Sequence, residues 1–406
     1  MSGRLQEIAG WLVRRRADMP AWMNRIIDAP AQNPDGVIGR IAYRVLGGAG
    51  ASNTSVPESE LRVYIAPTNY SGQGYLWARA LEAADPRLGA RNMAVDVPGG
   101  YAFPADNLVP IAANNASTDW QKTERDAVRR FTHVLIEAER PIFGGLFGRD
   151  VAAEVEALEA AGVSVAFISH GTDIRDPREH ARRTPWSPYP DDPRTDLLQV
   201  AAETNLALLE RLRRPTFVST PDLLDDVPWA RWCPVVVDAD RFTTLAPVLA
   251  RDTARVIHAS SSVVQKGSHH IEPALRPLID SGDVDYALIS GVSSDRMPGV
   301  IAEADIVLDQ FRLGSYGVAA CEAMAAGRIV VGHVLPAVRA RIEQETGKEL
   351  PIVEATPDTL QEVIRSLLAD RDRAREIAAA GPLFVAAVHS GDRSARALID
   401  GWIDPS

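Results

Sequence analysis

From residue 61 onward, short apolar runs alternate with longer stretches in which apolar residues recur at helical spacing. In the first half, the runs of strand length are 61–67, 91–97, 132–138, 163–169 and 215–220. The stretches expected to be helices are 75–85, 120–131, 149–162 and 194–212. Strands separated by helices are typical of βαβ units, so this half predicts a parallel sheet covered by helices.

A second series of the same kind begins after the proline-containing segment 227–242. Its expected strands are 255–261, 284–291, 305–311 and 328–334. Its expected helices are 269–282, 296–304 and 359–370, with further helices closing the chain. The fold class is therefore α/β, with two Rossmann-like parallel-sheet domains facing a cleft.

The length of 406 residues also favours two domains. We expect the first at residues 59–236 and the second at 237–406, with the last helix packing back on the first domain. Residues 1–58 show apolar residues at helical spacing and a short basic run, Arg14–Arg16, which predicts an N-terminal helical extension. We expect this extension to pack on the body or on a protein partner. A helix lying on a membrane surface is the alternative, and it stays open.

The composition excludes several classes of protein. Hydrophobic residues make up 46% and charged residues 24%, which is ordinary for a soluble globular chain. The net charge of −11 argues against a nucleic-acid partner. Two cysteines, no apolar run of membrane-spanning length and no signal-peptide pattern predict a cytoplasmic protein, with peripheral contact at the inner membrane surface left open.

The stretch 309–327 carries an unusual combination of residues. Gly314–Gly317 form a turn between a predicted strand and the apolar helix that contains Glu322. Free N–H groups at a helix start bind anions, and glycines let a phosphate approach the backbone. Glu322 then lies where it reaches a ribose hydroxyl next to a diphosphate. The alternative is a tight turn into a core helix, with Glu322 facing solvent.

Lys266 and Gly267 follow the first strand of the second series. Only three of the 43 basic residues are lysines, Lys122, Lys266 and Lys348. A lysine at position 266 therefore indicates that a compact positive charge is needed there. From the loop after that strand, Lys266 is expected to reach the same cleft and neutralise a diphosphate.

Three segments, 169–175, 265–278 and 304–332, together resemble family 4 glycosyltransferases of the GT-B fold, in particular bacterial members of the polysaccharide type. The resemblance covers about residues 61–400 and is strongest over 251–335. It implies a retaining, metal-independent hexosyltransferase-like enzyme without a cofactor. The donor is a nucleotide diphosphate sugar, and the acceptor is a glycan, a lipid-linked molecule or a small molecule in cell-surface polysaccharide or glycoconjugate synthesis.

The resemblance also implies roles for particular residues. Glu322 matches the second of the family's two glutamates, which holds the ribose, whereas the first glutamate falls at Gly314 and is missing. Lys266 matches the diphosphate lysine. The arginine that commonly precedes this lysine has no counterpart. Ser315 and Tyr316 complete the expected donor-binding turn with Gly314, Gly317 and Gly267.

A third cluster, His170, Asp173 and Arg175, follows the predicted strand 163–169. In similar enzymes a histidine of this domain faces the donor sugar, and the basic residue after it lies near phosphate. We therefore expect His170 to be catalytic with Lys266 and Glu322, and Arg175 to bind the donor. A structural hydrogen-bonding role is the alternative for His170, and Asp173 is expected to brace the loop. We expect no metal, because the adjacent His269 and His270 diverge on a helix.

The acceptor side is expected to include Gly72 and Gly74, which follow the strand 61–67, and Arg182 and Arg183 in the segment 180–194. A tight strand-to-helix turn and an exposed lid explain these residues equally well. Two alternative functions also stay open. One is a sugar-nucleotide epimerase-like enzyme of the same fold, and the other is a non-catalytic partner module in a glycan-assembly complex.

Overall fold

The computed structural model describes residues 51–97, 103–243, 246–260 and 263–405. They form two compact units, which comprise residues 51–168 with Leu212–Pro215, and Ser169–Arg211 with the residues from Thr216 onward. Most of the expected N-terminal extension, residues 1–50, lies outside the described residues, and residues 51–58 contain neither helix nor strand. The predicted domain boundaries stay a prediction.

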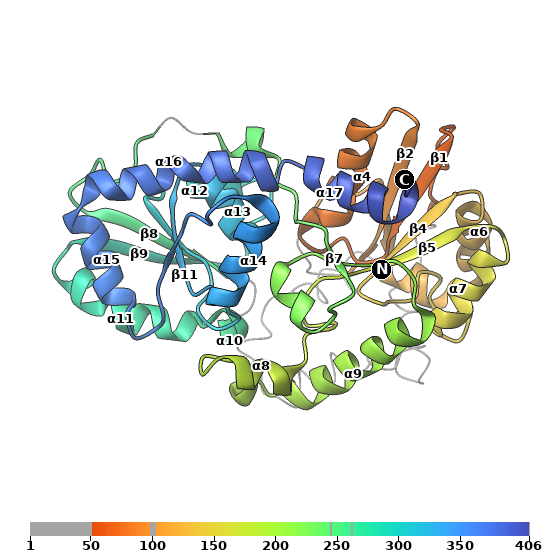
Figure 1. Ribbon diagram of the computed structural model, residues 1–406, viewed down its shortest axis with the longest axis horizontal. Helices are drawn as coiled ribbons and strands as arrows, with labels where there is room; N and C mark the ends of the chain where they lie inside the picture. Colours follow the sequence, from red (N-terminus) through yellow and green to blue (C-terminus); the bar gives the residue numbers. More distant parts are fainter. Residues whose placement is uncertain (1–50, 98–102, 244–245, 261–262, 406) are drawn as a thin grey trace, which may run out of the picture. The chain divides into compact units, whose positions relative to one another are not determined.

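The first sheet has seven strands in the order β3-β2-β1-β4-β5-β6-β7 (Figure 1). The strands are β1 (Leu61–Ala66), β2 (Leu88–Asp96), β3 (Asn107–Pro110), β4 (His133–Glu137), β5 (Ser164–Ser169), β6 (Thr216–Val218) and β7 (Arg231–Trp232). Strands β1 to β5 pair in parallel, as do β6 and β7. Along the chain, the order reverses direction between β1 and β4, which is the switch point of a doubly wound sheet.

Helices connect these strands. The four longer ones match the predicted helices, whereas the two short ones at 111–116 and 177–183 were not predicted. The helices are α4 (Gln73–Ala84), α5 (Ile111–Ala116), α6 (Thr118–Val128), α7 (Val151–Glu159), α8 (Pro177–Arg183) and α9 (Thr195–Leu212). All five residues of β4 are buried, because helices cover a parallel sheet on both faces. The short strands β3 and β7 escaped the sequence analysis, since four and two residues carry too little pattern.

The second sheet has five parallel strands in the order β12-β11-β10-β8-β9. The strands are β8 (Ala254–Ala259), β9 (Val284–Ile289), β10 (Ile306–Leu308), β11 (Ile329–Gly332) and β12 (Ile352–Glu354). The helices are α10 (Val263–Lys266), α11 (Ser268–Asp280), α12 (Met297–Ala302), α13 (Val318–Ala325), α14 (Pro336–Thr346), α15 (Leu360–Ala369), α16 (Arg371–Val388) and α17 (Asp392–Leu398). The α/β prediction is confirmed, although the sequence analysis missed β12 and α14.

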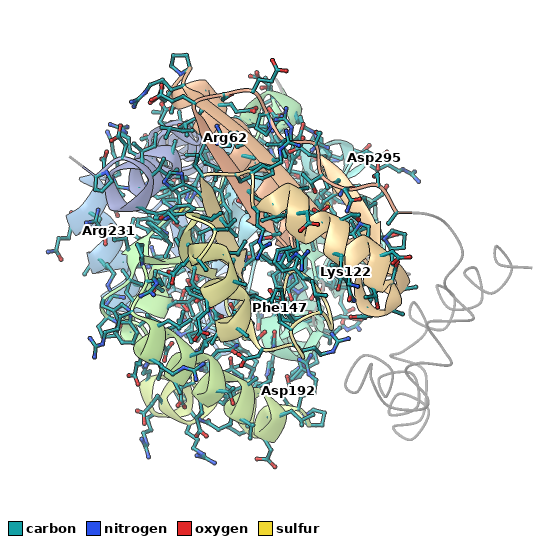
Figure 2. The ribbon with its side chains drawn as sticks, turned by 90° about the vertical axis from the view of Figure 1, so that its right-hand side faces the viewer. Arg62, Lys122, Phe147, Asp192, Arg231 and Asp295 are labelled. Carbon is teal, nitrogen blue, oxygen red and sulfur yellow. The ribbon has the colours of Figure 1, made fainter. Side chains whose placement is uncertain are left out.

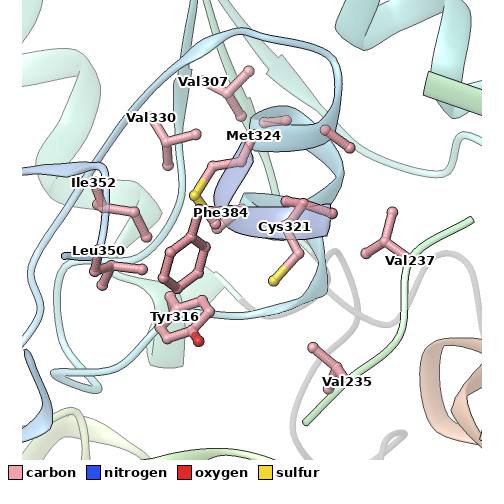
Figure 3. Close-up of a cluster of buried hydrophobic side chains, with 14 of the residues drawn as sticks. Val235, Val237, Val307, Tyr316, Cys321, Met324, Val330, Leu350, Ile352 and Phe384 are labelled. Carbon is pink, nitrogen blue, oxygen red and sulfur yellow. The ribbon is translucent and has the colours of Figure 1, made fainter. Parts of the chain in front are cut away.

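Two apolar layers enclose the second sheet. Alternate residues of β10 enter different layers: Val307 packs with α13 and α16, whereas Ile306 and Leu308 pack with α11 and α15. Figure 3 shows the first layer, where Met324 and Cys321 of α13 lie near Phe384 of α16. This packing fixes the first turn of α13 at the carboxyl end of β10. No helix in the described ranges is long and apolar enough to cross a membrane.

Candidate functional site

The switch point of the second sheet lies between β8 and β10. These strands are neighbours, and the chain continues from β8 toward β9 on one side and from β10 toward β11 on the other. Ligands of open α/β sheets bind beyond the carboxyl ends of the strands at such a point. Lys266 and Glu322 both belong to the segments that follow these two strands, so the fold brings the two predicted site residues to one place.

Lys266 ends α10, and its ammonium lies between the two strand ends. Its Nζ donates a hydrogen bond to the Ala259 carbonyl at 3.1 Å and lies 3.8 Å from Oδ1 of Asp309. The backbone N–H of Phe311 donates to the Lys266 carbonyl at 3.1 Å, which joins the two loops. Lys122 on α6 (Figure 2) and Lys348 are exposed, whereas the Lys266 side chain is only 16% exposed.

Asp309 is the site residue that the sequence analysis missed. It follows β10 directly, its residue is 1% exposed, and its Oδ2 accepts a hydrogen bond from the Gly317 N–H at 3.1 Å. Burial raises the pKa of this carboxyl, while the Lys266 charge and the Gly317 N–H act in the opposite direction. The expected row of free amides at Gly314–Gly317 is therefore wrong at one position, because Asp309 already accepts from Gly317.

Glu322 lies on α13 between the buried residues Cys321 and Ala323 and is itself half-buried. Burial raises the pKa of its carboxyl to about 7, while the charges of Arg241 and Lys266 lower it. The described part of the chain gives this carboxylate no hydrogen bond. A carboxylate that is partly desolvated and unpaired beside two cations is available to a ligand hydroxyl.

Gly314 has a physical reason to be glycine. Its φ of +65° lies in the left-handed region, and a Cβ there would lie 2.6 Å from Cγ of Leu335. The backbone N–H of Leu335 also donates to the Gly314 carbonyl at 2.9 Å, which holds the two segments together. No glutamate fits at this position without moving the chain. The conformation of the turn therefore accounts for the absence of a glutamate at position 314.

The side chains of Ser315 and Tyr316 are buried and do not line an open site. Tyr316 belongs to the apolar layer of Figure 3, and its hydroxyl lies 3.1 Å from Nε2 of His389. Of these two residues, only the backbone atoms are therefore expected to contact the donor. Gly267 has a φ of +76°, and a Cβ there would lie 2.9 Å from Cγ of Arg312, so packing alone demands glycine.

Arg175 forms a buried ion pair. Its guanidinium donates to Oδ2 of Asp222 at 3.1 and 2.6 Å, and the Arg175 residue is only 5% exposed. Burial lowers the pKa of Arg175, but the charge and hydrogen bonds of the Asp222 carboxylate act in the opposite direction, and the pKa is raised above its ordinary value. In this arrangement Arg175 stabilises the loop that follows β5, and contact with a donor phosphate stays a prediction.

The loop that begins at His170 is braced as expected. The Asp173 carboxylate accepts hydrogen bonds from the N–H groups of His170 at 2.7 Å and of Gly171 at 2.5 Å. Arg182 pairs with Glu179 on the exposed face of α8, and Arg183 pairs with Asp226 at 2.8 Å. The predicted roles of His170, Arg182 and Arg183 toward sugar or acceptor stay predictions.

Gly72 and Gly74 lie at the start of α4 in the other unit. Gly72 has a φ of +75°, and a Cβ on Gly74 would lie 2.5 Å from Nδ2 of the buried Asn92. The neighbouring Glu137 carboxylate accepts from the N–H groups of Thr68 and Asn69, both at 2.9 Å. The positive φ explains Gly72 and internal packing explains Gly74, and their predicted contact with an acceptor stays a prediction.

Comparison with known proteins bears on the fold. Residues 280–400 match the protein-family model described as glycosyl transferase-like, and no curated protein matches the chain. Sucrose-phosphate synthase from Thermosynechococcus elongatus superposes with a TM-score of 0.53 at 13% identity, covering 83% of this chain and 96% of that one. HepE from Anabaena, in complex with UDP, superposes with a TM-score of 0.51 at 12% identity, covering 83% of this chain and 98% of HepE. A glycosyltransferase from Rickettsia africae superposes with a TM-score of 0.50 at 11% identity, covering 84% of this chain and 97% of that one.

This chain has the GT-B fold. The predicted architecture of two Rossmann-like sheets is thereby confirmed, and the family match covers α13, where Glu322 lies. The HepE structures contain UDP, or UDP-glucose. In the GT-B fold of this chain, the switch point between β8 and β10 belongs to the second of the two sheets.

The described residues contain no group of three or more His, Cys, Asp or Glu side chains that could hold a metal ion. The expectation of a metal-independent site stays a prediction. The expectation that the side chains of His269 and His270 point apart is wrong. Their ring centroids lie 3.9 Å apart and their planes are tilted by 41°, so the two side chains lie against each other at the start of α11.

Proposed function

We propose that this chain is a retaining glycosyltransferase that uses a nucleoside-diphosphate sugar as donor. The observation that supports this most is the arrangement at the switch point of the second sheet. There Lys266, the first turn of α13 and the half-buried Glu322 supply a cation, backbone amides and a hydroxyl acceptor. These three groups suit a diphosphate attached to a ribose.

The transfer breaks the bond between the anomeric carbon of the sugar and the diphosphate oxygen. Negative charge develops on that oxygen, and the Lys266 ammonium stabilises it without reorganisation, since it is already held by Ala259. The acceptor oxygen forms the new bond to the anomeric carbon on the same face, and its proton passes to the departing diphosphate. His170 faces the sugar, and Glu322 accepts from the ribose. No metal is required in this scheme.

The acceptor is a glycan, a lipid-linked molecule or a small molecule of cell-surface glycoconjugate synthesis. The proposal is tested by incubating the protein with UDP-, GDP-, ADP- and dTDP-sugars, with and without candidate acceptors, and following both sugar and nucleotide. Acceptor-dependent release of nucleoside diphosphate supports it. Rapid conversion of donor alone to an altered sugar nucleotide would indicate an epimerase-like enzyme. Absence of binding to every nucleotide would indicate a non-catalytic partner module.

Replacing Glu322 by Gln is expected to separate stability from binding. In the folded protein the carboxyl has a pKa of about 7, above its ordinary value of 4.5. The unfolded chain therefore releases this proton at lower pH, so the wild type loses stability as pH rises from about 4.5 to 7. At pH 8, E322Q should be more stable by about 1–2 kcal/mol, after allowance for partial exposure, and equal to wild type near pH 4.5.

The same variant should bind UDP about tenfold more weakly, because hydrogen bonds to a charged group contribute about 1.5–3 kcal/mol each. Urea unfolding at the two pH values and calorimetry with UDP measure these effects. Glu343→Gln, on the exposed side of α14, serves as the control and should change neither. An E322Q protein that is less stable than wild type at pH 8, or that binds UDP equally well, contradicts the assigned role.

A further inference from the structure

Asp309 joins the two loops of the switch point through one carboxylate. Its Oδ2 accepts from the N–H of Gly317, the residue before α13, at 3.1 Å. Its Oδ1 lies 3.8 Å from the Lys266 ammonium, which belongs to the loop after β8. The side chain is 2% exposed, so solvent screens neither contact. One buried charge thus contacts both the cation and the helix start that the proposed function assigns to the diphosphate.

The second carboxylate oxygen is only partly satisfied. Oδ1 of Asp309 has no hydrogen-bond partner in the described chain, although buried polar atoms are nearly always paired. Gly317 leaves room for a carbon atom beside it, because a Cβ there would lie 3.9 Å from this oxygen, an ordinary contact distance. A buried carboxylate oxygen without a hydrogen-bond partner lowers the stability of the fold. Its position beside Lys266 points to a role in the function of that lysine.

The charge of Asp309 opposes an anionic ligand at the same place. A nucleoside diphosphate held by Lys266 approaches a buried carboxylate of like charge, and like charges repel strongly where water is excluded. The neighbouring contacts keep the arrangement rigid: Gln310 Nε2 donates to the Ser315 carbonyl at 2.7 Å, and the Phe311 N–H donates to the Lys266 carbonyl at 3.1 Å. Asp309 therefore orients the cation and at the same time reduces its net attraction for anions.

We propose that Asp309 is a positioning residue that holds Lys266 and the first turn of α13 in the arrangement required for transfer and weakens the hold on the nucleoside-diphosphate product. This inference rests on the proposed function, since it assigns the leaving diphosphate to Lys266. It predicts that removing the charge separates binding from turnover. Binding becomes tighter while turnover falls, which a purely structural carboxylate does not predict.

Asp309→Asn tests this, because it keeps the size of the side chain and an acceptor oxygen for the Gly317 N–H. At pH 8, calorimetry should show about tenfold tighter binding of UDP, and of inorganic pyrophosphate, than for wild type. Turnover of the donor sugar identified in the nucleotide-sugar screen should fall at least tenfold. The tighter binding should disappear in the Lys266→Met background, since that ammonium is what brings the diphosphate close to the carboxylate. Unchanged or weaker binding by D309N overturns the inference.

Asp305→Asn is the matched control. Asp305 is also 2% exposed and lies at the opposite end of β10, where its carboxylate accepts from the N–H groups of Leu249 and Arg255 at 2.7 and 2.8 Å. D305N should leave the affinity for UDP unchanged, and an equal gain in D305N overturns the inference. If D309N does not fold, Asp309→Ser is tested in its place. If neither folds, the residue is structural and the inference fails.

The outcomes also separate the two proposals. Wild-type protein that binds neither UDP, nor another nucleoside diphosphate, nor pyrophosphate contradicts the proposed function itself. Wild-type protein that binds UDP through Lys266, with no gain in D309N, contradicts only the role of Asp309.

Discussion

Lys266→Met should reduce the transfer rate by about 10²–10³, the typical loss when one preorganised charge-stabilising group is removed from an active site. The substitution keeps most of the aliphatic stem and deletes the ammonium that lies 3.8 Å from Asp309 and donates to Ala259. Sugar transfer is measured with the donor found in the nucleotide-sugar screen, and binding with UDP. Because charge grows on the leaving diphosphate, the transition state should lose more stabilisation than the bound donor.

The same variant should remain folded but become less stable at pH 8. Without the ammonium, Asp309 is a buried carboxylate that lacks its counter-ion, and such a loss is destabilising. Circular dichroism and the urea midpoint distinguish this loss from unfolding. Lys348→Met, at an exposed position of the same unit, is the matched control and should change neither property. A K266M protein with wild-type turnover would remove Lys266 from the mechanism.

Gly314→Glu should destabilise the protein by about 2–5 kcal/mol and give no gain in transfer. The left-handed φ of +65° costs a non-glycine residue about 1–2 kcal/mol, and forcing atoms into a filled space costs about 1–3 kcal/mol more. The space is occupied by Leu335, whose Cγ lies 2.6 Å from the position of a Cβ. The glutamate that the resemblance to family 4 glycosyltransferases led us to expect at this position therefore cannot simply be introduced here.

Two companion variants locate the cause of that loss. Gly314→Ala should already be destabilising. Adding Leu335→Ala should relieve the steric clash, so the double variant should lose less stability than the two single variants lose together. Gly317→Ala is the conformational control for stability, since its φ of −114° suits any residue and its Cβ would have no close neighbour. Full stability of G314E would show that the turn adapts, and the argument for a required glycine would fail.

The sequence predicted the fold because alternating apolar runs and amphipathic helices are local patterns. It also placed Lys266 and Glu322 correctly at the segments after two strands, since parallel strands bring their carboxyl ends to one edge. It missed β12, whose three residues carry little periodicity, and α14, where Val338 and Ile342 are the only buried residues.

The finer features of the site depend on contacts between distant parts of the chain. Arg175 was expected at a phosphate, yet it pairs with Asp222, 47 residues further along the chain. The occupied amide of Gly317 could not be foreseen without knowing that Asp309 turns back toward it. A polar residue directly after a buried strand was the available signal for Asp309, and no local pattern shows which group such a carboxylate will contact.

Hydrogen–deuterium exchange with and without UDP tests the location of the nucleotide most directly. We expect slower exchange on binding in the segments 263–270 and 314–324, which follow β8 and β10, and little change around the carboxyl ends of β11 and β12. The K266M protein should lose this protection at the same UDP concentration. Protection confined to other segments, or binding of UDP with unchanged exchange at both of these, would contradict the assignment of the nucleotide to the switch point of the second sheet.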